Sequence, residues 1–300
     1  MTTSSSRWSQ LTSAGLTNPS NAPCSGQARV PLHERAARST SIDVTFSDDI
    51  DIWLADAKSF FLTDEVQGAS NQFSIAARIA DGLLSSEELL RMKRFHFTRD
   101  ALLFCTAHIL KRVLLSMYEP AVNPHQWQFE NTAYGKPKLR AIPFGIPLYF
   151  NLSHSWPFAA LAISRSCPCG IDIELSRAES GLYENVYSTL HPLDLTLIAE
   201  SIEKERCFLE VWTRKEAAAK ALGTGLTWDF KSFHVCPKTA LVHGAPCAAT
   251  PVKAKTVSTA RKDVTLAVGW ISGNTDITMS EPRWVSSLPL SDLVNHTGLK

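Results

Sequence analysis

A glutamate and two lysines lie on one short segment, and their spacing raises the first question about chemistry. Residues 211–226 read VWTRKEAAAKALGTGL. In a helix, Glu216 and Lys220 stand four residues apart and share one face, while Lys215 points off beside them. Thr213 would be the N-cap of this helix, with Glu216 completing a capping box and Gly223 ending it. On this segment alone, helix capping, a surface ion pair and chemistry on a phosphate all remain open.

A second segment adds two carboxylates. Residues 170–175, GIDIEL, alternate in a way that predicts a strand with Asp172 and Glu174 on one face. Adjacent carboxylates repel each other unless they are solvated or share a cation. With Glu216 as a third oxygen donor, the set would suit magnesium rather than zinc, because no His or Cys accompanies the acids. A half-exposed strand with an acidic outer face is the alternative.

Together the two segments resemble the 4′-phosphopantetheinyl transferases of the Sfp type. Every fixed position of that family's paired motif is present, in order and at the expected spacing: Gly170, Asp172, Glu174, Trp212, Thr213, Lys215, Glu216, Ala217, Lys220, Gly223 and Gly225. The resemblance implies an α/β (α+β) fold of two similar halves with a pseudo-two-fold relation and the active site in the cleft between them. It also implies transfer of the 4′-phosphopantetheine arm of coenzyme A to a serine of an apo acyl or peptidyl carrier protein.

The resemblance also implies roles for single residues. Mg²⁺ held by Asp172, Glu174 and Glu216 would bridge the pyrophosphate oxygens. Lys220 would stabilise the phosphate charge in flight. Glu216 would accept the serine proton, with a metal-bound water polarised by Asp172 as the second choice. Adenosine 3′,5′-bisphosphate would leave, and Trp212 would anchor its helix in the core.

Two further matches precede these motifs. Residues 134–137, YGKP, form a predicted turn, and residues 150–155, FNLSHS, end an apolar strand in a polar turn. By resemblance, Lys136, Ser153 and His154 would hold the 3′-phosphate and pyrophosphate of coenzyme A, beside Lys215 and Lys220. A solvated lysine and a structural histidine are the alternatives.

The chain also departs from the family pattern. Leu103 and His108 stand where the family often has Arg, and Thr227-Trp228 replaces its usual Pro-Leu pair. A contact to the 3′-phosphate would then be absent, or Arg94, Arg99 or Lys111 would supply it.

Periodicity predicts the elements that must position these residues. Ile50–Leu54, residues 230–236 and residues 264–271 alternate as strands. Residues 84–95 form a predicted helix that opens with a capping box of Ser85 and Glu88. A longer helix follows Asp100, with one buried stripe: Leu103, Ala107, Leu110, Leu114 and Met117. Ile50–Leu54 repeats in Ile171–Leu175, and Phe97–Ala101 in Trp212–Glu216, which indicates an internal duplication.

We divide the chain into a mobile arm (1–42), an N-terminal half on the coenzyme A side (43–160), a C-terminal half with the metal and catalytic motifs (161–273), and a tail (274–300). A net charge of +1 indicates no general attraction to nucleic acid or membrane. We find neither a secretory signal nor an apolar run of the ~20 residues that span a bilayer. Seven scattered cysteines fit reduced thiols in a cytoplasmic monomer.

Two other functions compete with the transferase. One is a coenzyme A-binding protein without transferase activity, which Leu103 favours. The other is a metal-dependent nuclease, which the acids and a lysine would suit but the lack of a basic face opposes. As partners of a transferase we expect apo carrier domains of fatty-acid, polyketide or peptide synthases, docked near residues 175–210.

Overall fold

The fold combines seven α-helices with eleven strands in the described part of the chain, which confirms the α+β class. The computed structural model describes residues 48–61, 69–141, 147–176, 184–245, 250–273 and 277–285. The helices are α1 (Ala57–Phe61), α2 (Ala69–Ala80), α3 (Ser86–Met92), α4 (Thr98–Tyr118), α5 (Glu184–Tyr187), α6 (Pro192–Glu200) and α7 (Lys204–Leu222). The strands are β1 (Ile50–Asp56), β2 (Phe129–Asn131), β3 (Pro137–Leu139), β4 (Tyr149–Ser155), β5 (Phe158–Ser164), β6 (Cys169–Leu175), β7 (His234–Val235), β8 (Val242–His243), β9 (Val252–Val257), β10 (Val264–Ile271) and β11 (Arg283–Trp284). The predicted arm, residues 1–42, lies outside the described residues.

The two larger sheets repeat one arrangement of elements. The first has the order β11-β1-β5-β4, and the second has the order β6-β10-β9. In each, a strand (β1 or β6) precedes a long helix (α4 or α7), and a later antiparallel pair returns with its second strand in the centre of the sheet. This repeated topology confirms the two similar halves that the sequence predicts.

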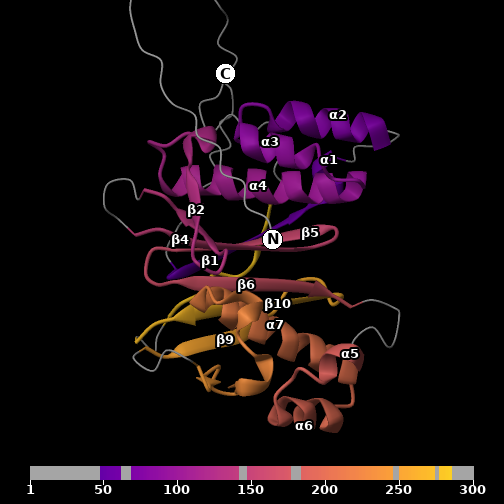
Figure 1. Ribbon diagram of the computed structural model, residues 1–300, viewed down its shortest axis with the longest axis vertical. Helices are drawn as coiled ribbons and strands as arrows, with labels where there is room; N and C mark the ends of the chain where they lie inside the picture. Colours follow the sequence, from indigo (N-terminus) through magenta and orange to yellow (C-terminus); the bar gives the residue numbers. More distant parts are fainter. Residues whose placement is uncertain are drawn as a thin grey trace, which may run out of the picture. The chain divides into compact units, whose positions relative to one another are not determined.

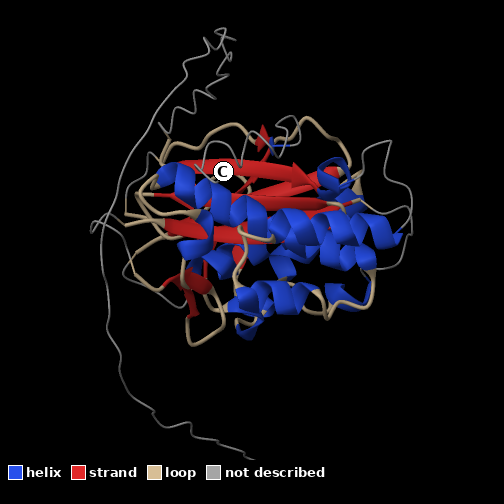
Figure 2. Ribbon diagram, turned by 90° about the horizontal axis from the view of Figure 1, so that it is seen from above, coloured by secondary structure: helices blue, strands red, loops and turns tan. Residues whose placement is uncertain are grey.

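The main apolar core lies between these two sheets. The first sheet contributes Ile50, Ile52, Leu54, Phe158, Ala160 and Ala162, and the second contributes Ile171, Ile173, Leu266, Val268 and Trp270. Helix α4 packs on the first sheet with α2 and α3 against it, and α7 packs on the second (Figure 1). Figure 2 shows the helices from above, lying over the strands. Each sheet is therefore covered on both faces, and each long helix has a fixed orientation.

Two glycines let α7 approach its sheet closely. Gly170 of β6 and Gly269 of β10 are cross-strand neighbours. A Cβ atom on Gly170 would lie 2.2 Å from the carbonyl oxygen of Ala217, and one on Gly269 would lie 2.4 Å from the same oxygen. The small side chains of α7 complete the contact, because Ala217, Ala218, Ala219 and Ala221 are all buried. Close packing at this point holds the charged end of α7 against β6.

The start of α7 differs from the prediction. The helix begins at Lys204, so Thr213 lies in its interior and its hydroxyl donates to the Leu209 carbonyl at 2.7 Å. Thr213 is therefore no N-cap, and the capping box with Glu216 was wrong. The helix starts nearly three turns earlier, because Phe208, Leu209 and Val211 pack with Leu190 and Ile198. Gly223 ends the helix as predicted, with a left-handed φ of 77°.

Other local predictions had mixed outcomes. The capping box of Ser85 and Glu88 is confirmed at the start of α3. Helix α4 is buried on nearly every side rather than along one stripe, and Met117 is only half-buried. Its length and apolar composition would allow it to cross a membrane, but 89% of its apolar window is buried inside the protein. The predicted strand at 230–236 was largely wrong: residues 230–232 form a 3₁₀ turn and only β7 follows.

Candidate active site

The acidic strand and the lysine of α7 meet at the edge of the second sheet. Lys220 Nζ lies 2.6 Å from Asp172 Oδ1 and 3.0 Å from Ser153 Oγ. The Ser153 hydroxyl donates to the same Asp172 oxygen at 2.9 Å. The fold thus brings together Asp172 from β6, Lys220 from α7 and Ser153 from β4.

Glu216 and Glu174 lie beside this group. Burial raises the pKa of Glu216 to about 7; Lys220 opposes the shift, and the charges of Asp172 and Glu174 add to it. The carboxylate of Glu174 accepts a hydrogen bond from Ser155 Oγ at 3.2 Å. Each of the three predicted acids therefore interacts with neighbouring polar or charged groups. Together they carry more negative charge than the single ammonium of Lys220 neutralises.

The donor set fits a hard divalent cation. Asp172 Oδ2 is buried and has no hydrogen-bond partner among the described residues, which is costly for an ionised carboxylate. In the described part of the chain, no three His, Cys, Asp or Glu side chains stand close enough together to hold a metal ion as they are placed. Asp172, Glu174 and Glu216 would have to close around the cation, and oxygen-only ligands would favour Mg²⁺.

Lys136 joins the turn between β2 and β3 to this site. Its Nζ donates to the carbonyl oxygens of Cys169, at 2.9 Å, and of Ala221, at 3.1 Å. The second of these belongs to the last turn of α7, where a cation satisfies a free carbonyl and the helix dipole. The ammonium of Lys136 thus lies beside the C-terminal end of α7.

Lys215 is not brought to the acids. It is fully buried, 2.6 Å from Asp194 Oδ2, and it also donates to the Phe233 carbonyl. Asp194 is held on its other oxygen by His234 Nδ1 at 2.6 Å. Together these contacts link α6, α7 and β7. Lys215 therefore stabilises the fold and does not lie beside Lys220.

His154 also points away from the acids. Side chains alternate along β4, so His154 lies on the face opposite Ser153. The histidine is exposed, whereas Ser153 is buried. Trp212 behaves as predicted, since its ring packs between those of Phe208 and Phe230 in the core.

A pocket of about 360 Å³ opens between α3, α4 and the β2–β3 hairpin. Its lining combines rings with cations, and includes Arg91, Phe104, Lys111, Phe129, Asn131 and Arg140. Asn131 and Pro137 belong to the hairpin that carries Lys136, so the turn between them connects this pocket with the end of α7. Cations and amide groups in such a lining suit the phosphates and polar edges of a nucleotide.

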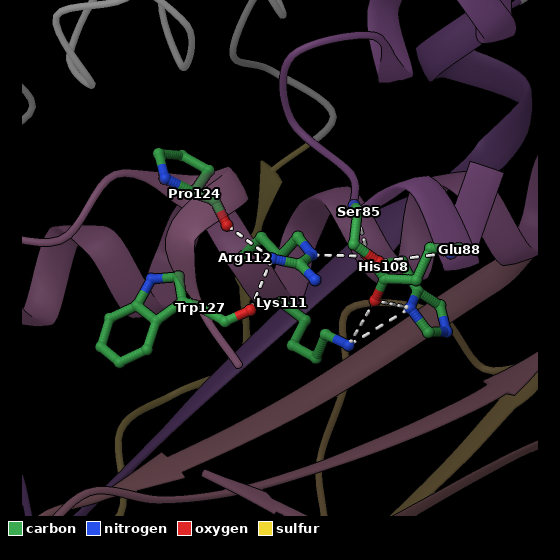
Figure 3. A network of polar contacts seen from close by, with 7 residues as sticks. All are labelled: Ser85, Glu88, His108, Lys111, Arg112, Pro124 and Trp127. Carbon is green, nitrogen blue, oxygen red and sulfur yellow. Dashed lines mark hydrogen bonds and ion pairs between the residues drawn. The ribbon is translucent and has the colours of Figure 1, made fainter. Parts of the chain in front are cut away.

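Figure 3 shows a polar network of Glu88, His108, Lys111 and Arg112, and all four residues also line the pocket. Glu88 lies 2.7 Å from His108 Nδ1 and accepts from Lys111 Nζ at 3.0 Å and from Arg112 Nε at 2.6 Å. Arg112 also donates to the carbonyls of Pro124 and Trp127. Burial alone would raise the pKa of Glu88, but the hydrogen bond from His108 and the charges of Lys111 and Arg112 hold it well below its usual range. The network fixes α3 against α4.

The three residues predicted as substitutes for the missing arginine differ in position. Lys111 lines the pocket and also pairs with Glu88, whereas Arg99 pairs with Asp100 at the surface and Arg94 is exposed. Arg91 and Arg140 also line the pocket, and the sequence reasoning missed both. Arg91 lies one helical turn after Glu88, a spacing that could have indicated a shared face.

Comparison with known proteins agrees with this architecture. The family model described as the 4′-phosphopantetheinyl transferase superfamily matches residues 168–267, and that described as 4′-phosphopantetheinyl transferase, N-terminal, matches residues 68–166. The chain is 34% identical over 145 residues to the 4′-phosphopantetheinyl transferase HetI of Nostoc sp., covering 48% of this chain and 61% of that protein. It is 33% identical over 152 residues to psf-1 of Bacillus pumilus, covering 50% and 62%. With Sfp of Bacillus subtilis it shares 29% over 153 residues, covering 51% and 66%. The chain thus spans about three fifths of the length of the first two relatives and 66% of Sfp.

Proposed function

Because the chain belongs to the 4′-phosphopantetheinyl transferase superfamily, we propose that it transfers the 4′-phosphopantetheine arm of coenzyme A to a serine of an apo carrier protein. The serine oxygen attacks the β-phosphorus of coenzyme A, and the bond from that phosphorus to the bridging oxygen breaks. Adenosine 3′,5′-bisphosphate leaves with that oxygen. The observation that carries the proposal is the contact of Lys220 with Asp172, next to a buried carboxylate oxygen that lacks a partner.

The acids of β6 and α7 prepare the site for the pyrophosphate. Asp172, Glu174 and Glu216 would hold Mg²⁺, which supplies charge neutralisation to the pyrophosphate oxygens when bound. The side chain of Lys220 is 26% exposed, and we propose that its ammonium binds a phosphate oxygen that enters from solvent. In the metal-free protein, burial raises the pKa of Glu216 to about 7. Glu216 would accept the proton of the serine hydroxyl.

The nucleotide end of coenzyme A would occupy the pocket beside α3. Arg91 and Arg140 line this pocket and supply charge for a phosphate there. These residues replace the cation missing at Leu103, which weakens the case for a protein that binds coenzyme A without transfer. Lys136, on the turn that connects the pocket with the end of α7, would bind the pyrophosphate between the pocket and Lys220.

The remaining expectations about the whole protein are proposals as well. The partners would be apo carrier domains of fatty-acid, polyketide or peptide synthases, and the protein would act as a cytoplasmic monomer. The masses of such carriers provide the test. Incubation with coenzyme A and Mg²⁺ should add roughly 340 Da, one phosphopantetheine group, to at least one apo carrier. A serine-to-alanine carrier is the matched control and should gain nothing. If no carrier among fatty-acid, polyketide and peptide-synthase types gained mass, binding without transfer would be the better description.

A further inference from the structure

The edges of the two large sheets meet through side chains rather than through backbone pairing. Strand β4 ends the first sheet and β6 ends the second, and the two strands lie next to each other. On the first sheet, the face toward the core is apolar along β1 and β5. Along β4 the same face is polar, because Asn151, Ser153 and Ser155 pair with Ala162, Ala160 and Phe158 of β5.

These three polar side chains each contact β6. Asn151 Oδ1 accepts from the Ile171 N–H at 2.8 Å, and thereby satisfies an amide of an edge strand. Ser153 Oγ donates to Asp172. Ser155 Oγ donates to Glu174 Oε2 at 3.2 Å. Each polar side chain on this face of β4 therefore contacts a different residue of the acidic strand β6.

Ser155 is the member of this row that has no role in the proposed reaction. It is buried, with 8% exposure, so its hydroxyl has little competition from water. The hydrogen bond from Ser155 to one oxygen of the Glu174 carboxylate restricts the rotation of that carboxylate. Glu174 is only half-buried and is the second-last residue of β6. Packing alone therefore restrains its side chain less than that of Asp172.

We propose that Ser155 is a positioning residue, which holds the carboxylate of Glu174 in the orientation that a divalent cation needs beside Asp172. The inference rests on the proposed function, because the cation is the one that the transferase would use. Ser155 itself touches neither the cation nor the substrate.

The test measures the affinity of the coenzyme A-free protein for Mn²⁺ by the electron paramagnetic resonance signal of the free ion. Ser155→Ala should bind Mn²⁺ about tenfold more weakly than the wild type, as losses of outer-shell hydrogen bonds do. Ser155→Thr keeps the hydroxyl and should restore most of the affinity. Ser164→Ala is the matched control. Ser164 is a buried serine of β5. Among the described residues its hydroxyl accepts from the backbone N–H groups of Ser166 and Cys167 and donates to the Cys167 sulfur. It should leave Mn²⁺ binding unchanged.

A double-mutant cycle separates positioning from a general loss of structure. In a Glu174→Ala background, Ser155→Ala should produce no further loss of Mn²⁺ affinity, because the carboxylate it orients is gone. Equal losses in both backgrounds would overturn the proposal, and so would wild-type affinity in Ser155→Ala. If Asp172→Ala lost Mn²⁺ binding while Ser155→Ala did not, the metal site would stand and only the positioning role would fall. If the wild-type protein bound no Mn²⁺, both the metal site and the positioning role would be overturned. The proposed transfer to a carrier would still be tested separately, by the masses of the carriers.

Discussion

The Nζ atom of Lys220 lies 2.6 Å from Oδ1 of Asp172, and the aspartate side chain is only 6% exposed. Lys220 is thus the counter-ion of a buried acid as well as the expected phosphate ligand. Removing either residue deprives a buried aspartate or a partly buried lysine of its nearest counter-charge, which costs more than loss of an exposed ion pair would.

We therefore expect Asp172→Ala to affect both activity and stability. Transfer should fall on the order of a hundredfold or more, because a metal ligand is lost. The free energy of unfolding should fall by about 1–3 kcal/mol, since the partly buried Lys220 loses its partner. Urea unfolding checks this value. The double variant Asp172→Ala/Lys220→Met should recover part of the stability, and additive losses would contradict the pairing.

Glu216→Gln should separate chemistry from helix formation. Glu216 lies in the middle of α7 and caps nothing, so the amide should leave the melting temperature of the metal-free protein the same or higher. Transfer should be nearly abolished, because the amide accepts no proton and is a poor Mg²⁺ ligand. Thermal melts and carrier mass shifts measure the two effects. Normal turnover by this variant would remove Glu216 from the chemistry.

His108 should make stability depend on pH below neutrality. Burial lowers the pKa of His108 to about 4 from an ordinary value of 6.5, although Glu88 opposes the shift. Between those values the unfolded chain binds a proton that the folded chain does not, so the contribution of neutral His108 is lost as pH falls from 6.5 toward 4. Between pH 6.5 and pH 4.5, the contribution of His108 to the free energy of unfolding should fall by about 2–3 kcal/mol.

Urea unfolding of the wild type and of His108→Gln across this window measures the His108 contribution as a difference. The gap between the two free energies of unfolding should change with pH in the stated direction, because glutamine does not titrate. A constant gap from pH 4.5 to 6.5 would show that His108 has an ordinary pKa.

Gly170→Ala should be destabilising by about 1–3 kcal/mol, because the new Cβ would overlap the backbone of α7. The Ala217 oxygen and the Ala221 nitrogen would lie 2.2 Å and 2.4 Å from that atom. Gly273→Ala provides the control, since in the described part of the chain no atom beyond its own neighbours lies within 4 Å of a Cβ added there. Guanidinium unfolding of both variants should show a loss in Gly170→Ala alone.

Part of the site could be predicted from the sequence because it depends on local periodicity. Alternation along residues 170–175 is enough to place Asp172 and Glu174 on one face of β6, and Ile171 and Ile173 enter the core as predicted. Gly223 ends α7 because a left-handed residue can end almost any helix. The order and spacing of the motifs were sufficient to indicate the family.

The directions of single side chains were decided only by tertiary packing. Lys215 and Lys220 lie about 140° apart around α7, since each residue advances the helix by about 100°. Both are plausible phosphate ligands in the sequence, but only one face of the helix can meet β6. In the same way, side chains alternate along β4, so Ser153 and Ser155 point toward the acids and His154 points away from them. The sequence alone determined which residue types were present and how they were spaced, whereas the packing of α7 and β4 on β6 determined which of them meet, because orientation depends on contacts between distant segments.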